Sequence, residues 1–256
     1  MIILKRRYKL LIGFIISGII LISIFFITKD RKIYYLSLGD SLAAGQTPNN
    51  TISDSYGEYV AEYLKDHEAL EFYTKKFAKS GYRSIDVLND LNENKKIKEG
   101  KKEITIKNAL IKADLVTVSV GANDLFYKLN FKSGLDINQF DDLYTYVDEA
   151  LKDVDKLLYE LRKSCKEQIM VLGFYNPFTS FSKSLSTTVE PVIIYGNNKM
   201  RSIVKKYDMT FVDIHNAFLA NDNYLPSKPE IHPTKEGYRA ISKIIISLID
   251  NKMLAK

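Results

Sequence analysis

The chain has very few of the residues from which metal, disulfide and phosphate sites are built. It contains one cysteine, Cys165, and three histidines among 256 residues, and no cysteine–histidine cluster has the spacing of a metal site. A glycine-rich loop of the phosphate-binding type is also missing. A single cysteine excludes an internal disulfide, and its position after an amphipathic stretch indicates a buried, unreactive thiol. These absences argue against metal-dependent, nucleotide-binding and disulfide-stapled classes of protein.

A basic excess is lacking outside the first 32 residues. The chain has 37 Lys and Arg against 31 Asp and Glu, which gives a net charge of +6. Residues 1–32 hold seven of the basic residues and one of the acidic ones, so residues 33–256 carry 30 of each. The positive charge therefore belongs to the N-terminal segment, and the remainder gives no case for binding nucleic acid.

What the N-terminus does have is a long hydrophobic run. Residues 10–28 form an uncharged stretch of nineteen residues, which at 1.5 Å per residue suffices to cross a hydrocarbon core of about 30 Å. A cleaved signal peptide has an apolar region of about 7–15 residues and a small-residue cleavage site, which residues 24–30 do not provide. We therefore expect an uncleaved single-pass anchor within residues 1–32. Four basic residues before the run and three after it favour, by a small margin, a cytoplasmic tail and an extracellular body.

Residues 33–256 alternate strand-like and helix-like segments. This pattern predicts one α/β domain in which helices cover both faces of a parallel sheet. Strands are expected at 33–38, 72–77, 114–120, 168–174 and 209–214, and helices at 56–64, 84–91, 141–163, 197–207 and 234–251, with Ser84 and Thr234 as candidate caps. Two stretches, 126–139 and 175–188, look like insertions after strand ends. Their apolar side chains either line a pocket or pack down onto the body: Tyr127, Leu129, Phe131, Phe178 and Phe181.

A serine directly follows the first expected strand. The apolar run 33–38 ends in Gly39-Asp40-Ser41, so Ser41 lies where a buried parallel strand breaks into a turn. Open α/β sheets carry their chemistry at this carboxyl edge, and other hydrolases present a nucleophilic serine on such a strand-turn-helix elbow. Ser41 is therefore a candidate nucleophile, although a serine here would also suit the cap of the next helix.

Two further segments reach the same edge of the sheet. Asn123 follows the third strand in Gly121-Ala-Asn123-Asp124, and Gly81 follows the second strand. Because neighbouring parallel strands end side by side, we expect Asn123 beside Ser41, where its amide can donate to an oxyanion. The backbone N–H of Gly81 can serve the same oxygen. Ordinary turn roles remain open for both residues.

The three histidines differ as candidates for the general base. His67 ends a charged helix and is expected to be solvated, while His215, just past the fifth strand, is a weaker candidate. His232 stands immediately before the last helix, where Pro233 stiffens the loop and holds the imidazole at the carboxyl edge. We therefore predict that His232 takes the proton of Ser41.

These segments together resemble the sequence blocks of the GDSL esterases, the SGNH hydrolase superfamily. The resemblance runs from about residue 33 to 249 and looks closest to the membrane-anchored or secreted lipase and acylhydrolase branch of Gram-positive bacteria. It implies a flavodoxin-like three-layer α/β/α sandwich around a five-stranded parallel sheet, with neither cofactor nor metal. It also implies Ser41 as nucleophile, His232 as base, and an oxyanion hole made by the N–H groups of Ser41 and Gly81 and the Asn123 side chain.

One position departs from the family pattern. The family places an aspartate three residues before the histidine, where this chain has Pro229, and a proline cannot orient an imidazole. Glu230, two residues before His232, carries a carboxylate on a longer stem and is the tentative replacement. A backbone carbonyl and the carboxylate of Asp213 are the alternatives.

The sequence thus predicts a serine esterase or lipase that forms an acyl-enzyme on Ser41. Anchoring beside a membrane favours lipid or lysophospholipid esters as substrates. The alternative substrate is an O-acetyl group on cell-wall polysaccharide. The third hypothesis is a surface-displayed binding protein that has lost turnover, and Pro229 is its only support.

Overall fold

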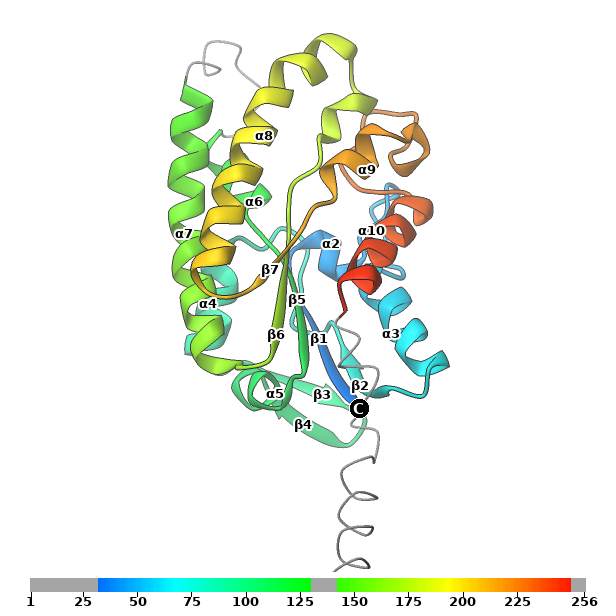
Figure 1. Cartoon of the computed structure of the whole chain (residues 1–256), viewed down its shortest axis with the longest axis vertical. Coiled ribbons are helices and arrows are strands. Elements are labelled where there is room, and N and C mark those ends of the chain that lie inside the picture. Colours follow the sequence, from blue (N-terminus) through cyan, green and yellow to red (C-terminus); the bar gives the residue numbers. More distant parts are fainter. Residues whose placement is uncertain (1–31, 130–141, 250–256) are drawn as a thin grey trace, which may run out of the picture.

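A five-stranded sheet forms the centre of the molecule (Figure 1). The computed structural model describes residues 32–129 and 142–249. Every strand pair in this sheet is parallel and the strand order is β2-β1-β5-β6-β7, so the predicted parallel sheet is confirmed. The strands are β1 (Ile33–Gly39), β2 (Leu70–Thr74), β5 (Leu115–Ser119), β6 (Gln168–Leu172) and β7 (Thr210–Val212).

The side chains of β1 explain why both faces of the sheet are covered. Leu36 and Leu38 belong to one hydrophobic core cluster, whereas Ile33 and Tyr35 belong to a second one. Successive side chains of a strand point to opposite faces, so the two clusters lie on opposite sides of the sheet. All seven residues of β1 are buried, as expected for an inner strand of a parallel sheet.

Helices form a layer on each face of the sheet (Figure 1). The apolar sides of α4, α5, α7 and α8 pack on one face, and those of α3 and α10 pack on the other. Sheet and helices together make the three layers expected from the sequence. The bounds are α3 (Tyr56–Asp66), α4 (Ser84–Asn92), α5 (Ile106–Lys112), α7 (Leu143–Ser164), α8 (Lys183–Lys206) and α10 (Lys235–Leu248).

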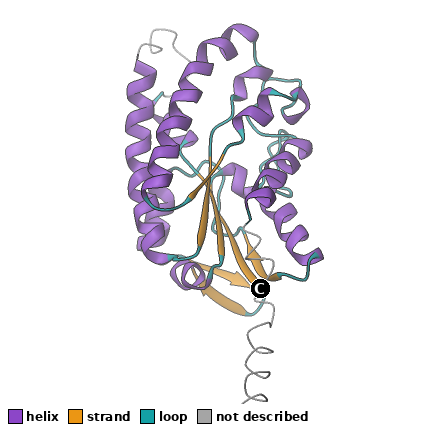
Figure 2. Cartoon of the chain, viewed as in Figure 1, coloured by secondary structure: helices purple, strands orange, loops and turns teal. Residues whose placement is uncertain are grey.

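Short helices gather at the carboxyl ends of the strands (Figure 2). Each begins within a few residues of a strand end or just before the last helix, so each lies close to a segment that the sequence nominates for the site. They are α2 (Ser41–Ala44), α6 (Ala122–Lys128), η3 (Pro177–Ser180), α9 (His215–Leu219) and η4 (Asp222–Tyr224).

The helix expected at residues 197–207 is much longer than predicted. It is α8, which begins at Lys183 and includes the last six residues of the stretch 175–188 that the sequence presents as an irregular insertion. Pro191 and Gly196 both disfavour a helix interior, which is why the pattern points to a later start. Burial of Val189 and Val192 against the core overrides these local preferences.

Three smaller features also differ from the prediction. An antiparallel hairpin of β3 (Lys96–Glu99) and β4 (Lys102–Thr105) separates α4 from α5, although its charged strands give little β-type pattern. The second strand ends at Thr74, before the predicted 72–77 is complete. Ser84 begins α4 but does not cap it, because its hydroxyl donates to Asp124 instead. Thr234, in contrast, caps α10 as predicted.

The predicted anchor lies almost wholly outside the described residues, which begin at residue 32. Within residues 32–129 and 142–249, no helix is both long enough and apolar enough to cross a membrane.

Candidate active site

Ser41 stands on a sharp turn that depends on a glycine. Gly39, the last residue of β1, has a φ of +122°, and a Cβ atom there would lie 1.9 Å from the Ser119 carbonyl oxygen of β5. Only glycine therefore allows the strands to approach so closely before the chain turns into α2. The cap of α2 is Asp40, whose Oδ1 accepts a hydrogen bond from the Leu42 N–H at 3.0 Å. Ser41 is thus the first residue of the helix, and the capping role falls to its neighbour.

His232 reaches Ser41 from the other end of the chain. Its Nε2 lies 3.0 Å from the Ser41 Oγ, although 191 residues separate the two. The imidazole is 8% exposed and sits in the loop before α10. Thr234 accepts a hydrogen bond from the Gly237 N–H, which fixes the start of α10 directly after this loop. The geometry is that of a serine hydroxyl hydrogen-bonded to a base.

Glu230 completes a chain of three residues. Its Oε1 lies 2.8 Å from His232 Nδ1 and also accepts hydrogen bonds from the backbone N–H groups of Ile231 and His232, at 2.7 and 3.2 Å. Burial alone would raise the pKa of Glu230, but the Ile231 N–H and the hydrogen bonds and charge of His232 outweigh it and hold the pKa below its ordinary value. The carboxylate is therefore ionised when it accepts from the imidazole.

The other proposed acid, Asp213, has different partners. Its Oδ2 pairs with Arg201 at 2.9 Å, and its Oδ1 accepts from the His215 N–H at 3.2 Å. Glu230 is thus the carboxylate that contacts His232, which corresponds to the tentative assignment from sequence.

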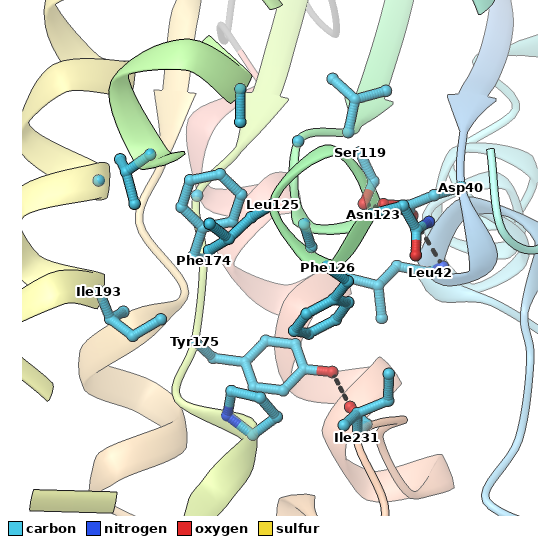
Figure 3. A pocket seen from close by; sticks show the side chains of 18 of the residues that line it. Asp40, Leu42, Ser119, Asn123, Leu125, Phe126, Phe174, Tyr175, Ile193 and Ile231 are labelled. Carbon is cyan, nitrogen blue, oxygen red and sulfur yellow. Dashed lines mark hydrogen bonds between the residues drawn. The ribbon is translucent and has the colours of Figure 1, made fainter. Parts of the chain in front are cut away.

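The loop that follows β6 holds the segment carrying Glu230 and His232. The Tyr175 hydroxyl donates to the Ile231 carbonyl (Figure 3). The Ser180 hydroxyl donates to the Glu230 carbonyl at 3.0 Å. Sequence reasoning missed both residues, because each looks like an ordinary member of a long loop. Together these contacts fix the backbone on either side of the carboxylate.

Asn123 lines the same pocket as Ser41. Its Nδ2 donates one hydrogen bond to the Tyr82 carbonyl at 2.9 Å. A primary amide has two N–H groups, so the second one is left to donate to a substrate oxygen. The contact to Tyr82 also orients the amide and ties α6 to the loop that contains Gly81.

Gly81 lies in the loop between β2 and α4. It has a φ of +82°, and a Cβ added to it would meet no atom within 4 Å. The Lys79 N–H donates to the Gly39 carbonyl at 3.0 Å, so this loop is held against the turn that carries Ser41. The structure thus brings the Gly81 loop beside the Ser41 turn and links it to Asn123, as the sequence predicts for neighbouring strands.

Two buried aspartates support these loops, and neither was nominated from sequence. Asp124 accepts from the N–H of Ser84 at 3.0 Å and from its hydroxyl at 3.1 Å, which joins the start of α6 to the start of α4. Asp40 accepts from the Ser119 hydroxyl at 2.8 Å. Burial raises the pKa of Asp124 and raises that of Asp40 to about 7. Asp40 directly precedes Ser41 and Asp124 directly follows Asn123 in the sequence. This adjacency to candidate site residues is the sequence feature by which both aspartates could have been found.

An apolar pocket of about 110 Å³ leads away from Ser41. Figure 3 shows Asp40 and Asn123 at one end and Ile193, on α8, at the other, with Leu125 and Phe174 between them. Beyond the catalytic end the lining is almost entirely aliphatic or aromatic. It includes Leu125, Phe126 and Leu129 next to α6, Leu143, Val147, Ala150 and Leu151 on α7, Phe174 and Phe178 after β6, and Val189, Val192, Ile193 and Gly196 on α8.

The predicted pocket residues divide between the two roles left open for them, except Tyr127, which takes neither. Leu129 and Phe178 line the pocket. Tyr127 is 70% exposed, and the ring of Phe181 packs edge-on against Phe178 with centroids 5.4 Å apart. Phe131 lies outside the described residues.

The remaining histidines and the cysteine stand apart from Ser41. His67 is exposed, as expected, and its Nδ1 lies 2.8 Å from the Tyr63 carbonyl. His215 is buried, with its Nε2 2.8 Å from Glu190 Oε1 but not aligned for a hydrogen bond. Cys165 is a fully buried thiol, as predicted. Over the described parts of the chain, no group of three or more His, Cys, Asp or Glu is arranged to hold a metal ion.

Comparison with known proteins agrees with this geometry. The model of the GDSL-like lipase/acylhydrolase family matches residues 37–240, a range that includes Ser41, Gly81, Asn123 and His232. No curated protein matches the chain.

Several solved structures are similar in fold. The lipase Lip_vut3 from a goat rumen metagenome is 21% identical, with 83% of this chain and 95% of that chain covered and a TM-score of 0.64. Phospholipase A1 from Streptomyces albidoflavus NA297 is 19% identical, with 83% and 98% covered and a TM-score of 0.63. A catalytic mutant of Axe2, an acetylxylan esterase from Geobacillus stearothermophilus, is 18% identical, with 87% and 96% covered and a TM-score of 0.59.

At these identities the structural likeness concerns the fold alone, so the family rests on the sequence model. That model spans most of the chain and all four motifs. The chain belongs to the GDSL-like lipase/acylhydrolase family.

Proposed function

We propose that this ester hydrolase cleaves carboxylic esters with an apolar acyl group through an acyl-enzyme on Ser41. The observation that carries the proposal is the hydrogen-bonded chain from Ser41 Oγ through His232 to Glu230, with distances of 3.0 and 2.8 Å. Ser41 and His232 also line the apolar pocket, which offers a place for the acyl group beside the nucleophile.

In the first half-reaction, Ser41 Oγ attacks the ester carbonyl carbon while His232 Nε2 takes the hydroxyl proton. The carbonyl oxygen becomes an oxyanion, which accepts hydrogen bonds from the free amide N–H of Asn123 and the backbone N–H groups of Ser41 and Gly81. Glu230 accepts from His232 Nδ1 and stabilises the imidazolium. The intermediate then expels the alcohol, which leaves with the proton from His232 Nε2.

In the second half-reaction, water enters in place of the alcohol and gives its proton to His232 Nε2 as it attacks the acyl carbon. A second oxyanion forms and accepts the same hydrogen bonds, and its collapse releases the carboxylic acid while His232 Nε2 returns the proton to Ser41 Oγ. The ionised Glu230 supports the imidazolium in both halves, so the proline at position 229 does not deprive the base of an acid partner. This arrangement weighs against the hypothesis of a binding protein without turnover.

The pocket favours a lipid-like acyl group over acetyl. A longer chain buries its methylene groups against α6, α7 and α8, and each buried methylene contributes about 0.8 kcal/mol. An acetyl group would leave this apolar volume unfilled. Deacetylation is the second candidate, because an acetylxylan esterase has a similar fold. Two of the similar structures are a lipase and a phospholipase A1, in line with a lipid ester.

The test is hydrolysis of p-nitrophenyl esters from acetyl to palmitoyl by the wild-type chain and the Ser41→Ala variant. We expect serine-dependent turnover that rises with chain length, and a loss of about 10⁴-fold or more in the variant. Turnover confined to acetate would support the deacetylase instead. Equal rates for wild type and variant would contradict the assignment of Ser41.

We also propose that residues 1–32 anchor the protein in the cell membrane with the catalytic domain outside. The support is the uncharged nineteen-residue run in the sequence. Fractionation of cells expressing the full chain and a version starting at residue 33 tests this. We expect the full chain to stay in the membrane fraction after a high-salt wash. Recovery of the full chain in the soluble fraction would contradict the anchor.

A further inference from the structure

We propose that Gly196 on α8 sets the length of the acyl chain that the enzyme accepts. The inference rests on the proposed function and deepens it, since it treats the apolar pocket as an acyl site with a defined far end. Ser41, His232 and Asn123 line one part of this pocket, whereas Val147, Val192 and Gly196 line it where α7 faces α8.

Gly196 has no conformational reason to be glycine. It lies inside the 24-residue helix α8, where glycine is less favourable than alanine. It is absent from the glycines with positive φ, so its backbone is one that any residue adopts. The helix therefore loses stability at this position without gaining a special conformation.

Close packing does not require a glycine at this position either. A Cβ at Gly196 would lie 3.5 Å from Phe174 Cδ2 and 3.6 Å from Val147 Cγ1, which are ordinary contacts. Gly173 and Gly121 differ, because a Cβ there would approach the Phe211 ring to 2.5 Å and the Phe174 ring to 3.0 Å. Close packing requires a glycine at those two positions, and Gly121 also has a φ of +104°, whereas a Cβ at Gly196 would fit without displacing a neighbour.

The neighbours of Gly196 belong to the wall of the apolar pocket. Phe174 and Val147 both line the pocket, so a side chain at position 196 would grow into it between them. Both neighbours are apolar, which matches the hydrocarbon part of a fatty acyl chain. Because position 196 is a glycine, the pocket has room there for the distal carbons of the acyl group.

The test is the chain-length profile of Gly196→Leu in the full chain, measured as kcat/KM on p-nitrophenyl esters from acetyl to palmitoyl. We expect the ratio of palmitoyl to acetyl kcat/KM to fall about tenfold or more, the loss expected when two methylene groups can no longer be buried. The preferred chain should become shorter. An unchanged ratio in a folded variant would overturn the proposal.

The matched control is Asn198→Leu, which places the same leucine side chain on the exposed side of the same helix. Its profile should follow the wild type. If Gly196→Leu does not fold, Val147→Ala decides the question, because it enlarges the pocket from the opposite wall and should shift the preference toward longer chains. No shift with Val147→Ala would then overturn the proposal. Failure of the proposed function is distinguishable, because in that case the wild type itself hydrolyses none of the esters or only the acetate.

Discussion

At the scale of single residues, the histidine contacts a glutamate that stands one position closer in the sequence than the aspartate of the family pattern. Pro229 occupies the usual place, yet Glu230 Oε1 receives the imidazole N–H and two backbone N–H groups. The longer side chain folds back over its own backbone, so the carboxylate is held before any substrate arrives. The sequence nominates this residue, but whether it reaches the ring depends on the loop conformation, which no pattern predicts.

Glu230→Gln tests this role directly. The amide oxygen can still accept from the backbone, but it carries no charge to stabilise the imidazolium. We expect kcat to fall by up to about 10⁴-fold with little change in KM, as for loss of the acid in other triads. Steady-state kinetics on the preferred ester measure this, with Asp213→Asn as control. An unchanged kcat in Glu230→Gln would show that another group orients His232.

Asp40 carries a second residue-scale prediction, on stability. Burial raises its pKa to about 7, from near 3.9 in an unfolded chain, so between these values the folded protein holds a proton that the unfolded chain has lost. Stability from this group is therefore present at low pH and is lost as pH rises toward 7, by up to about 4 kcal/mol. Urea unfolding at pH 5 and pH 8 should show this fall, and Asp40→Asn should reduce it. Equal pH dependence in both proteins would contradict the assignment.

At the scale of elements, the loop after β6 holds the segment that carries Glu230 and His232, here called the Glu230–His232 segment. Tyr175 donates to the Ile231 carbonyl while its ring stacks on Phe218 at 4.3 Å. Tyr175→Phe keeps the stacking and leaves the buried carbonyl without its donor, at a cost of about 1–3 kcal/mol. We expect kcat to fall about tenfold with KM nearly constant, because the Glu230–His232 segment loses its support.

A merely structural role for Tyr175 would lower stability and leave kcat unchanged, so thermal unfolding is measured on the same samples. Tyr159→Phe is the control, since Tyr159 is 49% exposed on α7. A kcat of Tyr175→Phe equal to that of the control would show that the Tyr175 hydroxyl does not position the Glu230–His232 segment.

Helix α8 yields a prediction about stability at the same scale. Gly196→Ala adds a methyl group in ordinary contact with its neighbours and should raise the free energy of unfolding by about 1 kcal/mol. Gly173→Ala, whose Cβ would lie 2.5 Å from the Phe211 ring, should lower it. Urea titrations of the two variants compare them, and a destabilised Gly196→Ala would mean that the space beside Gly196 is already filled.

The elements also show where sequence reasoning succeeds and where it fails. The positions of Ser41, Asn123 and His232 follow from alternation of strands and helices, because parallel strands end at one edge. The early start of α8 does not follow, since Pro191 argues against a helix and only burial against the core overrides it. The roles of Tyr175 and Ser180 could not be predicted either, because their hydrogen-bond partners lie about fifty residues away in the chain.

At the scale of the whole molecule, β1 begins at one edge of the sheet and the candidate active site lies at the other. Ile33 starts β1 at the amino edge, and Ser41 follows β1 at the carboxyl edge (Figure 1). The seven residues of β1 span about 23 Å at 3.3 Å per residue. An anchor that precedes Ile33 would therefore attach at the edge of the sheet remote from the site.

The central claim is that Ser41 is a nucleophile activated by His232 and Glu230, and covalent labelling tests it most directly. The full chain, Ser41→Ala and Glu230→Gln are treated with a fluorophosphonate, and the adduct is located by peptide mass spectrometry. We predict one adduct per chain on Ser41 in the wild type, none in Ser41→Ala, and slower labelling in Glu230→Gln. An unlabelled wild type, or an adduct on a different serine, would contradict the account.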